Sequence, residues 1–222
     1  MIRRISFALL WLGFITYAFV FAPPDQPDTL DLIKSLSLGQ WDGINPLIIA
    51  LFNIMGIWPV IYSVLLFRDG QQQKIPAWPF AVGSFALGAF ALLPYLVLRE
   101  PITTIQPKLK EVKSESKLLQ ILESRWLGIG ILIGVMTLLT YGFGQGNWSD
   151  FVQQWQTNRF IHVMSLDFCM LAILFPTLLG DDMKRQGISN PVLFWVTVGI
   201  PLLGSTIYLL IRDYFHETTQ PI

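Results

Sequence analysis

Histidine and cysteine are nearly absent from this chain, which contains two histidines and one cysteine among its 222 residues. Di-iron desaturases and zinc metalloproteases hold their metals with a histidine cluster or an H-E-x-x-H turn, so this composition excludes both classes and predicts no metal site. Ser165 and His162 have no third group to complete a serine protease triad. Cys169 is the single cysteine, so an intrachain disulfide is excluded.

Charged residues are also scarce. They make up 14% of the chain, whereas an ordinary soluble domain has about 25%. Fifteen basic and fifteen acidic residues cancel, and no basic stripe is present, which argues against nucleic acid as a partner. The apolar fraction of 53% and the mean hydropathy of +0.53 predict a protein whose first partner is the lipid bilayer.

The apolar residues gather in long runs, and a membrane-spanning helix needs about 20 of them. Six segments approach this length: 5–22, 44–67, 76–98, 126–143, 160–179 and 191–211. We therefore expect an all-α, polytopic helical membrane protein with about six transmembrane helices, forming a single domain over residues 1–222. Apolar residues at helical spacing in the loops 23–43 and 99–125 predict two short interfacial helices. We expect no internal repeat.

The basic residues give conflicting signals about membrane orientation. Arg3 and Arg4 precede the first segment, which we interpret as an uncleaved signal anchor because Pro23 and Pro24 follow Ala22. These arginines favour a cytoplasmic N-terminus. With six spans, however, the basic loop 99–125 lies on the opposite side, and its larger number of lysines and arginines favours placing that loop in the cytoplasm.

Asp167 is an ionisable residue inside the fifth apolar segment. A charge near the membrane centre costs roughly 2.5–3.5 kcal/mol on insertion scales, so this carboxyl needs a neutral form, a partner or water. His162 is five residues away and on another face of the helix, about 140° around the axis. The expected partners lie on other segments: Asn53, Tyr62, Ser84 or Tyr141. Asp167 is either a proton or ion relay or a hydrogen-bonded structural residue.

The two histidines suggest a second kind of site. If segments five and six are antiparallel spans, His162 and His216 lie on the same side of the membrane, where two imidazoles have the chemistry to bind haem or one of them a chlorophyll magnesium. A pigment or haem is therefore a candidate cofactor. The plainer interpretation makes His162 an interfacial residue reached by water and His216 part of a solvated tail.

Small residues and prolines predict how the helices pack. Gly130 and Gly134 form a G-x-x-x-G motif, and Ser84 and Gly88 have the same spacing, which allows close helix contacts. Prolines within the apolar runs remove intrahelical hydrogen bonds and bend helices. They are Pro59, Pro94, Pro176 and Pro201.

Two blocks resemble a known family. They are PAWPFAVGSFALGAFALLPYLVLREP, residues 76–101, and RFIHVMSLDFCMLAILFPTLLGDDMKRQG, residues 159–187. They are similar to an uncharacterised family of multi-spanning membrane proteins of cyanobacteria and plastids, and the likeness covers about half of the chain. It implies a thylakoid or plasma membrane of a photosynthetic cell and no particular reaction. The matching polar residues of the second block are His162, Asp167, Asp181, Asp182, Lys184 and Arg185; the last four are expected in the loop after Gly180.

No catalytic constellation emerges, so we expect a non-enzymatic accessory protein that binds membrane proteins or pigments and assists assembly or maintenance of a photosynthetic complex. The first alternative is a small transporter or channel with Asp167 as a proton or ion relay. The second is a membrane enzyme acting on a lipid or quinone, whose residues come from Asn53, Tyr62, His162 and Asp167.

Overall fold

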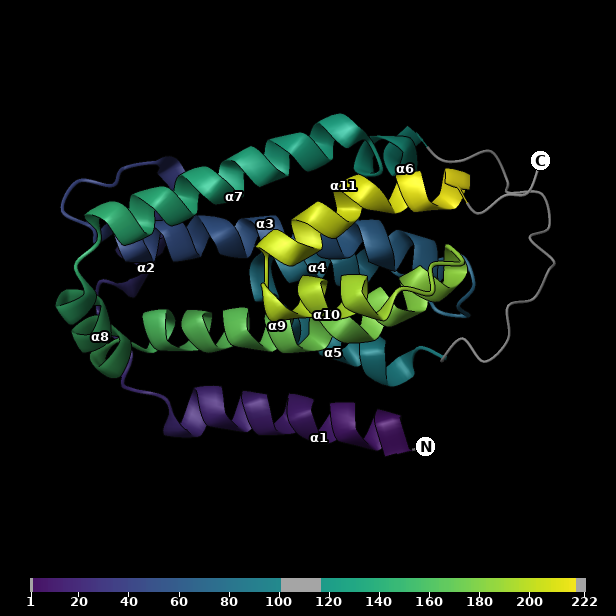
Figure 1. Cartoon of the computed structure of the whole chain (residues 1–222). Helices are drawn as coiled ribbons and strands as arrows, with labels where there is room; N and C mark the ends of the chain where they lie inside the picture. The colour runs from purple at the N-terminus through teal and green to yellow at the C-terminus, as the bar shows by residue number, and fades with distance from the viewer. Residues whose placement is uncertain (1, 101–116, 219–222) are drawn as a thin grey trace.

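The computed structural model describes residues 2–100 and 117–218, and every regular element in these ranges is a helix. Four stretches are long and apolar enough to cross a membrane, and in Figure 1 their axes lie side by side while the chain direction alternates from one to the next. They are Ile2–Phe21, made of α1 (Ile2–Thr16) and the π-helical η1 (Tyr17–Phe21), α3 (Pro46–Gly70), α7 (Arg125–Gln145) and α9 (Arg159–Arg185). The all-helical fold is confirmed.

The other helices are shorter. They are α2 (Thr29–Leu38), α4 (Trp78–Leu87), α5 (Ala89–Leu98), α6 (Lys117–Leu122), α8 (Trp148–Thr157), α10 (Pro191–Gly199) and α11 (Leu203–Thr218). Helices α2 and α6 form in the two loops where short helices are expected, but α8 is an addition. Its Asn147 N-cap and the spacing of Trp148, Phe151 and Trp155 are the sequence signals for it.

Helices α4 and α5 form a helical hairpin in place of one long helix. The rings of Phe80 and Tyr95 are 5.5 Å apart between centroids, although fifteen residues of straight helix would separate them by about 22 Å. Gln73, before α4, exchanges two hydrogen bonds with the backbone of Glu100, after α5. The segment 76–98 therefore begins and ends at the same end of the helix bundle.

Helices α10 and α11 form a second hairpin with the same layout. The turn between them includes Leu202, whose φ is 70°, and it brings the backbone of Gly204 against that of Thr197. Tyr208 on α11 donates a hydrogen bond to Asp182, near the end of α9, at 2.7 Å. The segment 191–211 thus also returns to the end from which it starts.

The expected number of about six spanning helices is not confirmed, because four helices in the described ranges meet the length and composition required. The third and sixth apolar runs look continuous in sequence, but local backbone chemistry divides them. Gly88 has φ 50° and ψ −127°, a conformation that residues with a side chain rarely adopt. Pro201, in the second turn, lacks the N–H that would continue a helix.

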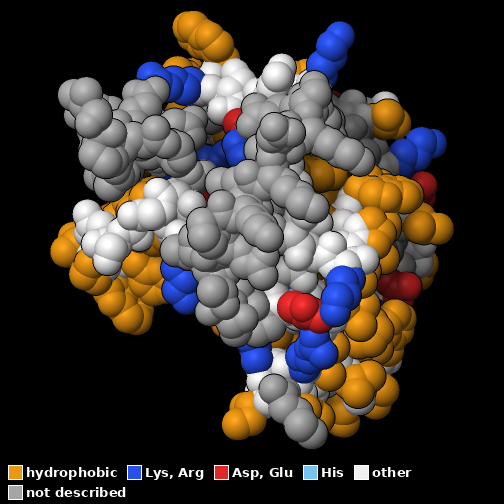
Figure 2. Space-filling view, turned by 90° about the vertical axis from the view of Figure 1, so that its right-hand side faces the viewer, with side chains coloured by type: hydrophobic (Ala, Val, Ile, Leu, Met, Phe, Trp, Pro, Cys, Tyr) orange, Lys and Arg blue, Asp and Glu red, His pale blue; other side chains and the backbone are white. Residues whose placement is uncertain are grey.

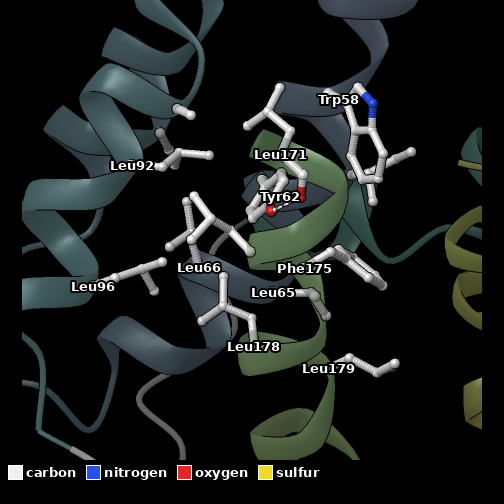
Figure 3. Close-up of a cluster of buried hydrophobic side chains, with 14 of the residues drawn as sticks. Trp58, Tyr62, Leu65, Leu66, Leu92, Leu96, Leu171, Phe175, Leu178 and Leu179 are labelled. Carbon is white, nitrogen blue, oxygen red and sulfur yellow. Dashed lines mark hydrogen bonds between the residues drawn. The ribbon is translucent and has the colours of Figure 1, made fainter. Parts of the chain in front are cut away.

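Helices α3 and α9 form the centre of the bundle, and their contact is shown in Figure 3. The labelled side chains come from α3 (Trp58, Tyr62, Leu65, Leu66), α9 (Leu171, Phe175, Leu178, Leu179) and α5 (Leu92, Leu96). Helix α4 packs on α3 and α10 on α9, while α5 packs on α1 and α11 on α7. Each hairpin is therefore held between a central helix and an outer helix.

Candidate functional site

Asp167 lies at the turn of the first hairpin. Its Oδ1 accepts a hydrogen bond from the backbone N–H of Ala89, the first residue of α5, at 2.8 Å. The first N–H groups of a helix have no intrahelical partner, and the helix dipole favours a negative group there. The Asp167 carboxylate therefore compensates for breaking a helix inside the bundle.

The hairpin turn fits closely around this carboxylate. Asp167 is 6% exposed, and a Cβ atom added to Gly88 would lie 1.7 Å from its Oδ2. Gly88 is thus required twice, for its backbone conformation and for the space that Asp167 occupies. The Ser84 and Gly88 pair, expected as a helix-packing face, instead belongs to this turn.

The side chains expected to pair with Asp167 have other partners, so that expectation is wrong. Asn53 donates to the carbonyl of Ile49 at 2.8 Å, Tyr62 to that of Leu171 at 2.6 Å, and Ser84 to that of Ala81 at 2.7 Å. Tyr141 is half-buried and packs against the hydrophobic cluster that contains Ile48 and Ile161. The partner of Asp167 is the backbone N–H of Ala89, which could not be predicted because the segment 76–98 was expected to be one continuous helix.

His162 lies near the start of α9 and is buried, at 6% exposed, instead of being reached by interfacial water. Its ring stacks on Trp155 of α8, with centroids 4.4 Å apart. Its Nε2 is 2.9 Å from the hydroxyl of Tyr17 in η1, and its Nδ1 is 2.9 Å from the carbonyl oxygen of Trp155. Both ring nitrogens are therefore engaged within the protein.

The expected pairing of His162 with His216 at one side of the membrane is wrong. It assumed that segment six crosses the membrane, but α10 and α11 turn back. His162 lies at the end of the bundle that carries α8, whereas the backbone of His216 belongs to the last turns of α11 at the opposite end (Figure 1). The two histidines do not form a common haem or chlorophyll site.

A cluster of buried charges lies where both hairpins open, and we call this end of the bundle the hairpin end. Arg99, after α5, donates to Asp69 of α3 at 2.9 and 2.7 Å and to Asp181 of α9 at 2.5 Å. Tyr95 also donates to Asp69 at 2.5 Å, and Arg185 pairs with the same carboxylate. Burial opposes the charge of Arg99, but the two carboxylates outweigh it and raise its pKa.

A second set of charges lies beside the first. Tyr208 donates to Asp182, and Arg212 Nη1 is 3.6 Å from the same carboxylate. Arg212 Nη2 also donates to Glu123, which follows α6, at 3.0 Å. Arg68 pairs with Glu123 through two of its nitrogens. Among the described residues, the two sets together hold four arginines and four carboxylates, so the charges of these eight side chains balance.

The two sets are related by an internal repeat, which corrects the expectation that none exists. Residues 69, 95 and 99 are Asp, Tyr and Arg, and the same residues recur 113 positions later at 182, 208 and 212. Asn45 and Asn158, separated by the same interval, are the N-caps of α3 and α9. The order span, short helix, span, hairpin also occurs twice, as α1–α5 and as α7–α11.

The loop expected after Gly180 is helical, so the assignment of its charged residues is corrected too. Asp181 and Asp182 belong to α9 and are buried, whereas Lys184 is exposed. Sequence reasoning did not identify Asp69, Arg99, Glu123 or Arg212 as site residues. The recurring Asp, Tyr and Arg spacing was the signal that could have found most of them.

The glycines of the G-x-x-x-G motif on α7 do not form an internal packing face. A Cβ atom at Gly130 would meet nothing within 4 Å, and one at Gly134 would meet only Ile57 Cδ1, at 3.9 Å. Gly128 and Gly142 are the residues of α7 that allow close contacts, with Leu210 and Ala50 respectively. Gly130 therefore faces away from the part of the chain that the structure describes.

Within the described residues, no group of three or more histidine, cysteine, aspartate or glutamate side chains has the arrangement to hold a metal ion. The site thus consists of the Asp167 turn and the duplicated ion-pair cluster. In comparisons with known proteins, no family model, no curated protein and no solved structure matches this chain.

Proposed function

We propose that this protein is a small membrane transporter or channel, in which Asp167 is the ionisable group of a proton or ion path. The observation that carries the proposal is the position of this buried carboxylate at the turn of a helical hairpin within the bundle. Non-helical backbone at membrane depth is tolerated where protein buries it or where it lines a water-filled cavity. Discontinuous helices of this kind are typical of transporter binding sites.

The membrane arrangement in this proposal is four spans and two re-entrant hairpins that both enter from the hairpin end. Asp167 lies eight residues from the start of α9, or about 12 Å along its axis. The hairpin turn therefore reaches well past the middle of the bundle. Two parallel repeats, each contributing one hairpin, correspond to a transporter architecture with an axis along the membrane normal.

This arrangement removes the conflict over orientation, because the hairpins return the basic loop to the side of the N-terminus. Among the described residues, the basic side chains at the opposite end are Lys34 and Arg159. Those at the hairpin end are Arg3, Arg4, Arg68, Lys74, Arg99, Lys117, Arg125, Lys184, Arg185 and Arg212. Figure 2 looks onto this end, where lysine and arginine side chains surround the face. By the positive-inside rule, this distribution favours a cytoplasmic hairpin end.

Two buried donors support a polar path through the bundle. Trp58 Nε1, beside the α3–α9 contact in Figure 3, and Arg99 Nη1 have no hydrogen-bond partner among the described residues. Buried polar groups are normally satisfied by protein or water. A path that connects the hairpin end with Asp167 along α3 would satisfy both groups.

The test is proton flux in liposomes that hold a pH indicator, driven by a potassium diffusion potential. Wild-type protein is expected to conduct, and Asp167→Asn is expected to lose flux while keeping its thermal stability, because an amide oxygen still accepts the Ala89 N–H. Gly130→Ala is the matched control, since an outward methyl group leaves the path unchanged. Equal flux in wild-type and Asp167→Asn liposomes would overturn the proposal.

A second candidate function is an accessory protein that assists a photosynthetic membrane complex. The observation that favours it is the outward Gly130 on α7, which offers a close-contact position to a helix of another protein. The resemblance to the cyanobacterial and plastid family supports a thylakoid or plasma-membrane location. Purification from native membranes in mild detergent, with an absorption spectrum, tests this function. Loss of co-purifying subunits in Gly130→Leu would support it, and a colourless protein without partners would contradict it.

A further inference from the structure

Two arginines of the hairpin end bind the same carboxylate. We call this the two-arginine pocket; it consists of Arg68 of α3, Arg212 of α11 and the Glu123 side chain between them. Arg68 binds through Nε and Nη2, with Nη2 2.6 Å from Oε2. Arg212 Nη2 donates to Oε1 at 3.0 Å. The fork of an arginine matches two oxygens of a carboxylate or a phosphate.

The internal repeat shows why this pocket forms in the second set of charges and not in the first. In the first set, Arg99 binds Asp69 and also Asp181, which belongs to the central helix α9. The interval of 113 positions relates residue 181 to residue 68. In the second set of charges, the place of Asp181 is therefore taken by Arg68, which has the opposite charge. Two arginines therefore approach each other there, and the carboxylate between them comes from Glu123, which lies outside both repeats.

The position of Glu123 differs in kind from that of Asp181. Asp181 belongs to the last turns of the 27-residue α9, whereas Glu123 follows the six-residue α6 between the repeats. Access differs as well: the Arg99 side chain is 0% exposed, while that of Arg68 is 28% exposed. An external anion thus has a route to Arg68 that it does not have to Arg99.

We propose that the two-arginine pocket is an anion-binding site for a carboxylate or phosphate group, and that Glu123 occupies it in this structure as an internal ligand. When the Glu123 carboxylate is displaced, the nitrogens of Arg68 and Arg212 that now bind it are the donors for an anion at the hairpin end. A free phosphate and the headgroup of an anionic lipid share this chemistry. The site does not depend on transport through Asp167.

The test replaces the internal ligand and restores it from outside. Glu123→Gln is purified in an uncharged detergent, and its melting temperature is measured with inorganic phosphate, with chloride at equal ionic strength, and in mixed micelles containing phosphatidylglycerol or phosphatidylcholine. We expect a lower melting temperature than in wild type and a rise of about 5 °C when the pocket is filled. Recovery with phosphate identifies a free anion as ligand, and recovery with phosphatidylglycerol alone identifies a headgroup.

Two variants control for the geometry. In the double variant Arg68→Asp with Glu123→Gln, Arg212 faces an aspartate at position 68, as Arg99 faces Asp181 in the first set. This double variant should therefore be stable without an anion and should not respond to one. Asp181→Asn removes the equivalent carboxylate of the first half, where no response is expected because Arg99 is enclosed. An unresponsive Glu123→Gln, or equal responses in all three variants, would overturn the proposal.

If Glu123→Gln unfolds during purification without an anion, the same anions are added from solubilisation onward. Recovery of Glu123→Gln with phosphate or phosphatidylglycerol, but not with chloride or phosphatidylcholine, supports the pocket. Failure under every condition, while the double variant is recovered, contradicts it.

Discussion

The carboxylate of Asp167 accepts the backbone N–H of Ala89 at 2.8 Å across the turn that divides α4 from α5. Asp167 thus binds the first N–H group of a helix in another segment. If α9 crosses a membrane, this hydrogen bond offsets part of the cost of placing the acid there, because the N–H group would otherwise be unpaired. A structural role and a role in a proton path are compatible, because the second carboxylate oxygen is not needed for this hydrogen bond.

The structural contribution of Asp167 is separable from its charge. Asp167→Leu leaves the Ala89 N–H buried without an acceptor, which should destabilise the protein by about 1–3 kcal/mol. Asp167→Asn keeps an acceptor and should cost less. Thermal unfolding of both purified variants in detergent measures the difference. Equal melting temperatures for the two variants would mean that the hydrogen bond does not hold the turn.

Gly88 should tolerate no side chain. In Gly88→Ala the new Cβ would collide with Asp167 Oδ2, at 1.7 Å, and the backbone would keep an unfavourable φ. Backbone strain of this kind costs about 1–3 kcal/mol, and the displaced carboxylate adds to it. We expect a much lower yield of folded protein and a lower melting temperature. Gly130→Ala, which meets nothing within 4 Å, is the control that should match wild type.

The sequence predicts the long helices well, because apolar length is a local property that needs no knowledge of neighbours. Segments 44–67 and 160–179 correspond to α3 and α9 within a few residues, apart from the charged last turns of α9. The hairpins could not be predicted in this way. The chain reverses at Gly88 in the first hairpin and at the turn that contains Leu202 in the second. In the sequence, the apolar residues on either side of each turn look like one span.

The ion-pair cluster was missed for a related reason. Asp69 and Arg99 each end an apolar segment and look like ordinary boundary charges, and only the hairpin brings them to the same place. Most positions of the two repeats share only apolar character, so the duplication is hidden in a composition that is apolar everywhere. Once the structure pairs Asp69 with Tyr95, the recurrence at Asp182 and Tyr208 is evident.

The repeat predicts that equivalent tyrosines contribute equally. Tyr95→Phe and Tyr208→Phe each remove one hydrogen bond to a buried carboxylate, and such bonds contribute about 1.5–3 kcal/mol. Melting temperatures of the single variants and of the double variant test this. Similar single effects that add in the double variant are expected if the two sets act independently. A large effect of one tyrosine alone would show that only one set stabilises the bundle.

The proposed arrangement of four spans and two re-entrant hairpins makes the sharpest prediction, because it changes which loops share a side of the membrane. Single cysteines are placed at Gln72, Glu100 and Ser189, and at Gln40 and Gln153, in a background in which Cys169 is alanine; all of the new sites are exposed. A membrane-impermeant maleimide should label the first three from the cytoplasmic side and the last two from the opposite side.

A six-span topology predicts a different labelling pattern. It places Gln72 and Glu100 on opposite sides, since a full span would separate them, and it also separates Gln40 from Gln153. The hydrogen bonds between Gln73 and Glu100 require the same side for the first pair. Labelling of Gln72→Cys and Glu100→Cys from opposite sides would therefore contradict the first hairpin and, with it, the proposed path through Asp167.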